Sequence, residues 1–201
     1  MILRTERLIV RPWQRADLER MAAWPRFPDP LDAVWNWPHL LQAHGTADLF
    51  FLTRAHDPCR QEWTITTQAG QVIGHLGIRA IQQAERQAQL GIGLGYPFLQ
   101  QGYGTEALRA FLHAFFGAMG FQTLRLEVAA YNSRARRVYH RLGFREVGVV
   151  WQRIGPTSDF GFLSGPAYAA VRPLFRQDGA AMLALSSEMT LTALDWQRRQ
   201  P

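Results

Sequence analysis

The 201-residue sequence predicts an α/β fold, and three observations lead to this prediction. Residues 63–67 and 72–81 have the composition of strands, and the turn at residues 68–71 joins them as a hairpin. Residues 102–119 carry apolar side chains at helical spacing, and Gly120 is expected to end that helix. The third observation is the strand and helix that come next.

Residues 123–128 alternate between apolar and polar side chains, as a half-buried strand does. Asn132 is placed to cap a second helix. Gly143 followed by Phe144 has the form of a glycine helix stop with an apolar residue behind it. This order of strand, helix, strand and helix favours a layered α/β domain.

Outside this central region the elements are predicted with less regular patterns. We found no internal repeat and no linker, so residues 1–201 are expected to form one domain with 155–175 as a loop excursion. The further predictions are strands at 8–13, 50–53, 89–96, 147–151 and 181–185, a helix at 14–24, an irregular aromatic segment at 25–38, a loop at 155–165 and an ambiguous stretch at 168–175.

Composition excludes several classes of protein. The chain is 47% hydrophobic, which is ample for a core, and carries a formal charge of +6. Its basic residues are scattered, which argues against a nucleic-acid partner. Cys59 is the single cysteine, so no intrachain disulfide or multi-cysteine metal site is expected. An early run of charged residues and the lack of a ~20-residue apolar span predict a cytoplasmic protein with no membrane partner.

The segment from Gln100 to Thr105 lies between a predicted strand and the long helix. Gly102 and Gly104 let the backbone approach a ligand closely, and a helix N-terminus offers unpaired N–H groups to an anion. No Gly-Lys-Ser/Thr follows, so this is not a Walker loop, and the three-glycine dinucleotide spacing is missing. The plain alternative is a glycine turn that only leads into a helix.

Together with Gly102–Leu108, the segment Asn132–Phe144 resembles the GNAT acetyltransferase superfamily, and the opening Thr5–Pro12 is similar to its RimJ/RimL-like branch. The resemblance spans about residues 5–150. It implies a mixed, mostly antiparallel sheet, splayed around acetyl-coenzyme A and flanked by helices. It also implies an N-acetyltransferase that moves an acetyl group from acetyl-CoA to a primary amine by direct transfer.

The resemblance carries cofactor roles to particular positions. The backbone N–H groups from Gln101 through Gly102, Tyr103 and Gly104 to Thr105 would hold the pyrophosphate. The strand that ends at Leu94 and Tyr96 would bind the pantetheine arm through its backbone. Asn132 would contact the cofactor near the opening of the sheet. Because Leu99 stands where the superfamily often has Arg or Gln, Arg137 is a candidate for meeting the phosphate charge.

Tyr139 falls where the family often places the acid that protonates the departing thiolate. With a reference pKa of ~10, a tyrosine keeps its proton at neutral pH and can donate it. A purely structural role on the buried stripe of its helix is the alternative. Ala135 replaces a serine frequent in this branch, and residues 89–96 hold no carboxylate. The candidates for the base are therefore Glu127, His75 or an ordered water.

The acceptor is expected to be a protein N-terminus, a polyamine or an amino sugar. Trp24, Trp35 and Trp37 and the loop 155–165 are the expected walls of its pocket, although ordinary packing would also explain the tryptophans. The sequence leaves a monomer and a homodimer equally open. The alternative from another class is a non-catalytic acyl-CoA-binding sensor, which would keep both loop glycines but need no acid.

Overall fold

The computed structural model describes residues 1–199, which form two compact units. The first unit comprises residues 1–124 together with the C-terminal stretch from Thr192, and the second comprises residues 125–191. The prediction of an α/β fold with helices flanking a mostly antiparallel sheet is confirmed, since each unit contains antiparallel strand pairs and helices.

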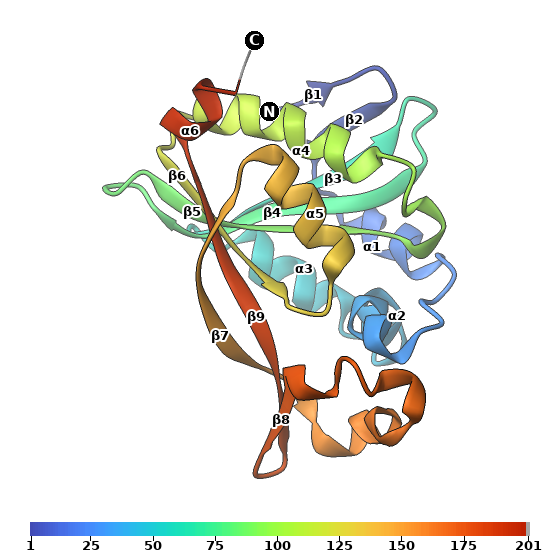
Figure 1. The fold of residues 1–201 in the computed structure, drawn as a ribbon. Helices are drawn as coiled ribbons and strands as arrows, with labels where there is room; N and C mark the ends of the chain where they lie inside the picture. Colours follow the sequence, from blue (N-terminus) through green and yellow to red (C-terminus); the bar gives the residue numbers. More distant parts are fainter. Residues whose placement is uncertain (200–201) are drawn as a thin grey trace. The chain divides into compact units, whose positions relative to one another are not determined.

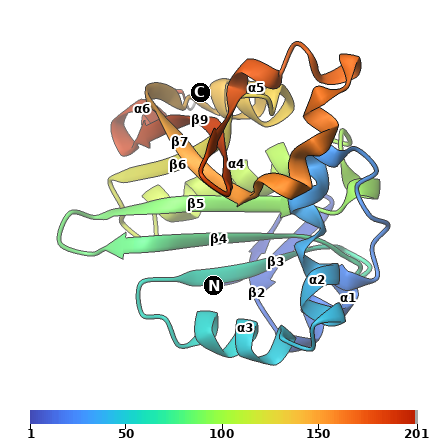
Figure 2. The ribbon, with the colours of Figure 1, turned by 90° about the horizontal axis from the view of Figure 1, so that it is seen from below.

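The sheet of the first unit runs in the order β1-β2-β3-β4-β5, and every neighbouring pair is antiparallel. The hairpin predicted around residues 68–71 connects β3 and β4, which run side by side with β5 in Figure 2. The strands span Leu3–Arg4 (β1), Leu8–Pro12 (β2), Gln61–Thr67 (β3), Val72–Gln82 (β4) and Gln87–Leu94 (β5).

Helices cover both faces of this sheet (Figure 1). One face packs against α4 (Tyr103–Phe116), where the ring of Phe111 lies 5.3 Å from that of Trp63 on β3. The other face packs against α1 (Arg15–Ala22), α2 (Trp37–Ala43) and α3 (Ala47–Ala55). The apolar stripe predicted for α4 is its buried face, which forms the centre of the core. The short helix α6 (Ala193–Gln197) ends the described chain.

The prediction of a strand at residues 50–53 is wrong, because these residues lie within α3. Aromatic and β-branched residues favour strands in isolation, but here tertiary packing decides. Phe50 and Phe51 place their rings against Trp13, at centroid distances of 6.2 and 5.0 Å. The segment 30–36 between α1 and α2, predicted as irregular, forms 3₁₀ turns.

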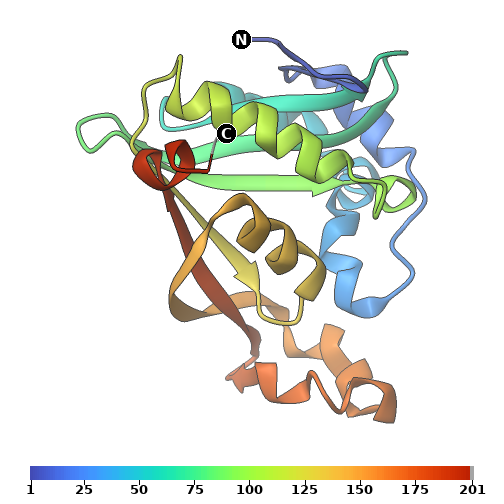
Figure 3. The same cartoon turned by 45° about the horizontal axis from the view of Figure 1, so that its top comes forward.

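In the second unit β9 lies between β6 and β7, and β8 also pairs with β9. Asn132 caps α5 and Gly143 ends it in a left-handed conformation, both as predicted. The expected loop at 155–165 is largely 3₁₀ helix and lies beside β8 (Figure 3). The elements span Thr123–Ala129 (β6), Ser133–Leu142 (α5), Arg145–Pro156 (β7), Phe175–Asp178 (β8) and Ala181–Thr192 (β9), with 3₁₀ helix at Thr157–Ser164, Pro166–Tyr168 and Arg172–Leu174.

A buried carboxylate attaches α1 to the sheet. Asp17 is fully buried and accepts two hydrogen bonds of 2.7 Å from the guanidinium of Arg11 on β2. It also accepts a 2.6 Å bond from Thr64 on β3 and bonds from the Gln14 backbone and Arg20. Burial raises the pKa of Asp17, but these hydrogen bonds outweigh it and hold the pKa below its usual value.

We expect Asp17→Ala to lower the free energy of unfolding by about 3–5 kcal/mol, because Arg11 is left as an uncompensated charge. Asp48→Ala, which removes an exposed ion pair with Arg15, is the control and should cost less than about 1 kcal/mol. Urea denaturation measures both. Since the pKa of Asp17 is lowered on folding, its contribution is complete above about pH 3.9 and is lost at more acidic pH. Equal losses in the two variants at pH 7 would contradict this role.

Candidate functional site

The loop before α4 presents unpaired backbone N–H groups. Gly102 is the N-cap residue, with φ of +82°, and no described side chain caps the helix. The first hydrogen bond of the helical ladder runs from the Glu106 N–H to the Gly102 carbonyl at 3.0 Å. The N–H groups of Tyr103, Gly104 and Thr105 precede that ladder, so they are free for an anion at the positive end of the helix dipole.

The two loop glycines differ in what they require. The positive φ lies at Gly102, whereas the backbone at Gly104 has no positive φ. A Cβ added to Gly104 would meet only the Leu94 side chain, at 3.5 Å. The space beside Gly104 is thus open to a ligand, and the absence of a side chain there is a matter of room rather than of backbone strain.

An arginine that the sequence did not single out lies at this loop. The Arg7 guanidinium donates to the Gln101 carbonyl at 3.1 Å and to Glu106 at 2.7 Å, and lies 4.6 Å from the Tyr103 ring centroid. Glu106 also accepts a 2.6 Å bond from Thr5. Burial raises the pKa of Glu106, but the bonds from Thr5 and Arg7 outweigh it and lower the pKa. Glu106 therefore anchors the N-terminal segment to the loop, in addition to lying in the first turn of α4, where a negative charge is favourable.

The end of β5 and the aromatic residues around it form a packed wall. β5 ends at Leu94, and Tyr96 is partly exposed, with its ring 5.6 Å from that of Phe27. The Trp24 indole donates a 3.0 Å hydrogen bond to the Val72 carbonyl. A Cβ on Gly95 would lie 2.6 Å from the Trp24 ring. Trp24 is therefore packed directly onto the backbone that follows β5.

The other two tryptophans predicted for the acceptor pocket lie on the α1–α3 side of the sheet. Trp35 is half-buried in the 3₁₀ segment before α2. Trp37 begins α2, and its ring centroid lies 5.1 Å from that of Phe50 and 5.4 Å from that of His75. The structure thus brings Trp37 onto one of the three candidate bases.

In the second unit the described side chains around α5 form a small apolar cluster. Tyr139 is buried, and its ring lies 5.6 Å from that of Phe144. Burial raises the pKa of Tyr139 to about 12. No other described residue hydrogen-bonds its hydroxyl. The side-chain oxygen of Asn132 accepts a hydrogen bond from the Ala135 N–H at 3.1 Å, so this oxygen is already used to cap α5.

Two polar candidates of this unit are exposed. Glu127 on β6 accepts a hydrogen bond from the Gln152 side chain, which in turn accepts one from Ser186 at 2.9 Å. Arg137 on α5 makes only a 3.3 Å contact to the Ser133 hydroxyl. Its guanidinium is therefore available to a solvent-borne anion.

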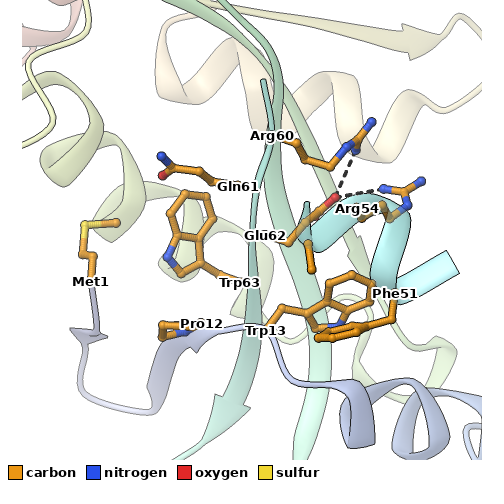
Figure 4. A pocket seen from close by; sticks show the side chains of 10 residues that line it. Met1, Pro12, Trp13, Phe51, Arg54, Arg60, Gln61, Glu62 and Trp63 are labelled. Carbon is orange, nitrogen blue, oxygen red and sulfur yellow. Dashed lines mark hydrogen bonds and ion pairs between the residues drawn. The ribbon is translucent and has the colours of Figure 1, made fainter. Parts of the chain in front are cut away.

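The first unit also contains an open cavity of about 330 Å³ beside β3, shown in Figure 4. Its walls include Trp13 and Phe51, and its charged groups are Arg54, Arg60 and Glu62, which form one ion-paired cluster. Residues 1–199 contain no group of three or more His, Cys, Asp and Glu side chains arranged to hold a metal ion. Within the same residues no helix is long and apolar enough to cross a membrane.

Comparison with known proteins decides the family. Residues 7–145 match the acetyltransferase (GNAT) domain. The chain belongs to the GNAT acetyltransferase family. Two uncharacterized N-acetyltransferases of Bacillus subtilis (strain 168) are similar to it: YycN is 32% identical over 48% of this chain, and YoaA is 25% identical over 75% of it. The matches span 62% of YycN and 86% of YoaA.

A solved structure with the same fold is that of a spermidine N-acetyltransferase from Vibrio cholerae in complex with CoA and spermine. It superposes with a TM-score of 0.65 over 96% of this chain and 99% of its own, at 15% sequence identity. At that identity the likeness shows the GNAT fold alone. The predictions of a GNAT fold and of an acetyltransferase family are thus confirmed.

The open space beside Gly104 leads to a prediction about cofactor binding. We expect Gly104→Val to abolish CoA binding, because its side chain would fill the space beside the free N–H groups. Ala110→Val on the same helix is the control, since it carries a similar β-branched cost away from the first turn. Calorimetric titration with CoA measures both variants. CoA affinity in Gly104→Val equal to that of the control would show that the loop is not the cofactor site.

Proposed function

We propose that this GNAT family member transfers an acetyl group from acetyl-CoA to a primary amine by direct attack of the amine on the thioester. The observation that carries the proposal is the open first turn of α4, with free N–H groups at Tyr103, Gly104 and Thr105 and no capping side chain among the described residues. Backbone donors and a helix dipole suit a pyrophosphate, and Gly104 leaves room for it.

The further cofactor contacts that we propose fall to residues predicted from the sequence. The backbone near Leu94 and Tyr96 would bind the pantetheine arm as an added strand does. Asn132 and Arg137 are proposed to contact the cofactor on the α5 side. Arg7 joins them in our proposal, because its guanidinium already donates to the Gln101 carbonyl and its side chain is 45% exposed.

In this proposal Tyr139 protonates the departing thiolate. Burial keeps its hydroxyl protonated at every physiological pH, because its pKa is about 12. The same burial makes it a weaker acid than a free phenol, whose pKa is ~10. Its contribution is therefore a hydrogen bond to the sulfur that becomes a full proton transfer as negative charge develops there.

The acceptor class is narrowed by charge. The ionic groups that act on His75, beside Trp37, are Glu62 and Arg54, and Glu62 is held by Arg54 and Arg60. Because its carboxylate is ion-paired to two arginines, Glu62 is not free to hold a polycation. We therefore propose an acceptor with a single ammonium group, such as a peptide N-terminus or an amino sugar, in preference to a polyamine. A peptide N-terminus would also fit the similarity of residues 5–12 to the RimJ/RimL-like branch.

The first test of this proposal is ligand-dependent stability with thiol release. Acetyl-CoA at ~100 times its dissociation constant should stabilise the fold by about 2.7 kcal/mol. Free thiol should then appear when peptides with free N-termini are added, and should be slower with spermidine. Stabilisation without thiol release from any amine of the panel would favour the acyl-CoA sensor. The absence of any stabilisation would overturn the proposed function altogether.

The second test removes the proposed acid. Tyr139→Phe keeps the ring that packs on Phe144, so the fold and the CoA affinity should be retained. Turnover should fall about 10²–10⁴-fold, the usual range for loss of a positioned acid. The loss should shrink with an acyl donor whose thiol is more acidic, because a better leaving group needs less proton donation. A constant loss across such donors would leave Tyr139 as a packing residue.

A further inference from the structure

The face of the sheet that α1–α3 cover has a strip in which three of four neighbouring residues are glycines. In the β4–β5 register Gly77 lies opposite Gly91 and His75 lies opposite Gly93, so these four residues share one face. A Cβ added to Gly91 would meet no atom within 4 Å. β5 therefore offers bare backbone and open space to a ligand on this face, immediately beside His75.

His75 lies across this strip from β4. A Cβ on Gly93 would come within 2.7 Å of the imidazole Cε1, so the ring rests directly on the β5 backbone. Trp37 packs edge-on against the ring from the other side, at 5.4 Å and 85°. The imidazole is thus held between β5 and α2 in one orientation, while the residue retains partial exposure.

The imidazole has a nitrogen with no partner. Its Nδ1 is buried and makes no hydrogen bond to any described residue. A buried polar atom of this kind requires a donor or acceptor from a water or a ligand. The other ring nitrogen, Nε2, is not among the buried unpartnered atoms, so it is the nitrogen that an amine in the open space over Gly91 can approach.

The surroundings of His75 favour the neutral ring. Burial lowers its pKa, and of the two charges that act on it Glu62 raises the pKa and Arg54 lowers it further. Glu62 comes from β3 and Arg54 from α3, and their ion pair is drawn in Figure 4. The elements in ring contact, α2 and β5, present the uncharged Trp37 and Gly93. A neutral imidazole at pH 7 can accept a proton.

We propose that His75 is the general base that takes the proton of the acceptor amine, which lies in the open space over Gly91. This inference rests on the proposed acetyl transfer. The amine nitrogen forms a bond to the thioester carbon and loses a proton to the imidazole, the C–S bond breaks, and the thiolate takes a proton from Tyr139. The imidazolium then releases its proton to water and the Tyr139 phenolate takes one from water, which restores both groups. In this proposal His75, rather than Glu127, is the base.

The test compares His75→Gln with His44→Gln, a matched change at an exposed histidine. Glutamine retains hydrogen bonding but accepts no proton, so kcat should fall about 10²–10⁴-fold while CoA affinity is unchanged. The wild-type acidic limb of kcat/KM, expected below pH ~6.5, should disappear in His75→Gln and persist in the control. Added imidazole should restore part of the rate of His75→Ala. A wild-type rate and an unaltered acidic limb in His75→Gln would overturn the proposal. It would also be overturned if Glu127→Gln alone lost the rate and the acidic limb.

A second readout does not depend on turnover. Imidazole ¹⁵N resonances of the CoA-saturated protein are followed as a short peptide with a free N-terminus is added, and then with the same peptide N-acetylated. The free peptide should shift the His75 signals and leave those of His44 in place, and the acetylated peptide should shift neither. Equal responses to both peptides, or none, would overturn the role of His75. Absence of thiol release from the wild type would instead overturn the proposed function, so the two failures are distinguishable.

Discussion

The packing of the first unit depends on a buried charge, the carboxylate of Asp17. An ionised group without water is tolerated only when its lone pairs are satisfied, and here Arg11, Thr64 and the Gln14 backbone supply the donors. Because these donors lie on β2, on β3 and at the start of α1, the carboxylate fixes the helix on the sheet. The chain that leaves α1 can then place Trp24 on Gly95 and Trp37 on His75. The packing of α1 through Asp17, which takes no part in the proposed reaction, therefore determines where Trp24 and Trp37 lie.

The glycines of β5 determine which part of the sheet under α1–α3 stays open for the proposed acceptor site. Alternate residues of a strand share a face, so Gly91, Gly93 and Gly95 all lie on the side of α1–α3. Gly95 is covered by Trp24 and Gly93 by His75, while the space above Gly91 is free. A side chain at Gly91 would fill the open space, and one at Gly93 or Gly95 would displace the ring above it. The glycines thus lower the strand propensity of β5 and provide the surface on which, in our proposal, the ligand and the imidazole meet.

The features that could be predicted from the sequence are those that depend on residues close together in the chain. The helix α4 followed from apolar periodicity, and the limits of α5 followed from Asn132 and Gly143, whose capping acts within a few residues. The prediction of a strand at residues 50–53 was wrong because Phe50 and Phe51 pack against Trp13, which is more than thirty residues away in the sequence. The contact of Arg7 with Glu106 joins residues 99 apart and leaves no local trace. His75 could be named as a candidate base, but its contact with Trp37 and its place over Gly93 depend on register and on helix docking.

One physical effect prepares both groups proposed for proton transfer. Burial penalises the charged form of any ionisable side chain, so it lowers the pKa of a histidine and raises that of a tyrosine. Burial is the largest effect on the pKa of His75, where Glu62 and Arg54 act in opposite directions, and it is the effect that raises the pKa of Tyr139. Acetyl transfer to an amine needs this combination, since one group must gain a proton while another loses one. Two uncharged groups also leave the neutral amine, rather than an ion, as the species that such a site favours. The desolvation that stabilises the fold through its apolar core is then also the source of the acid–base chemistry.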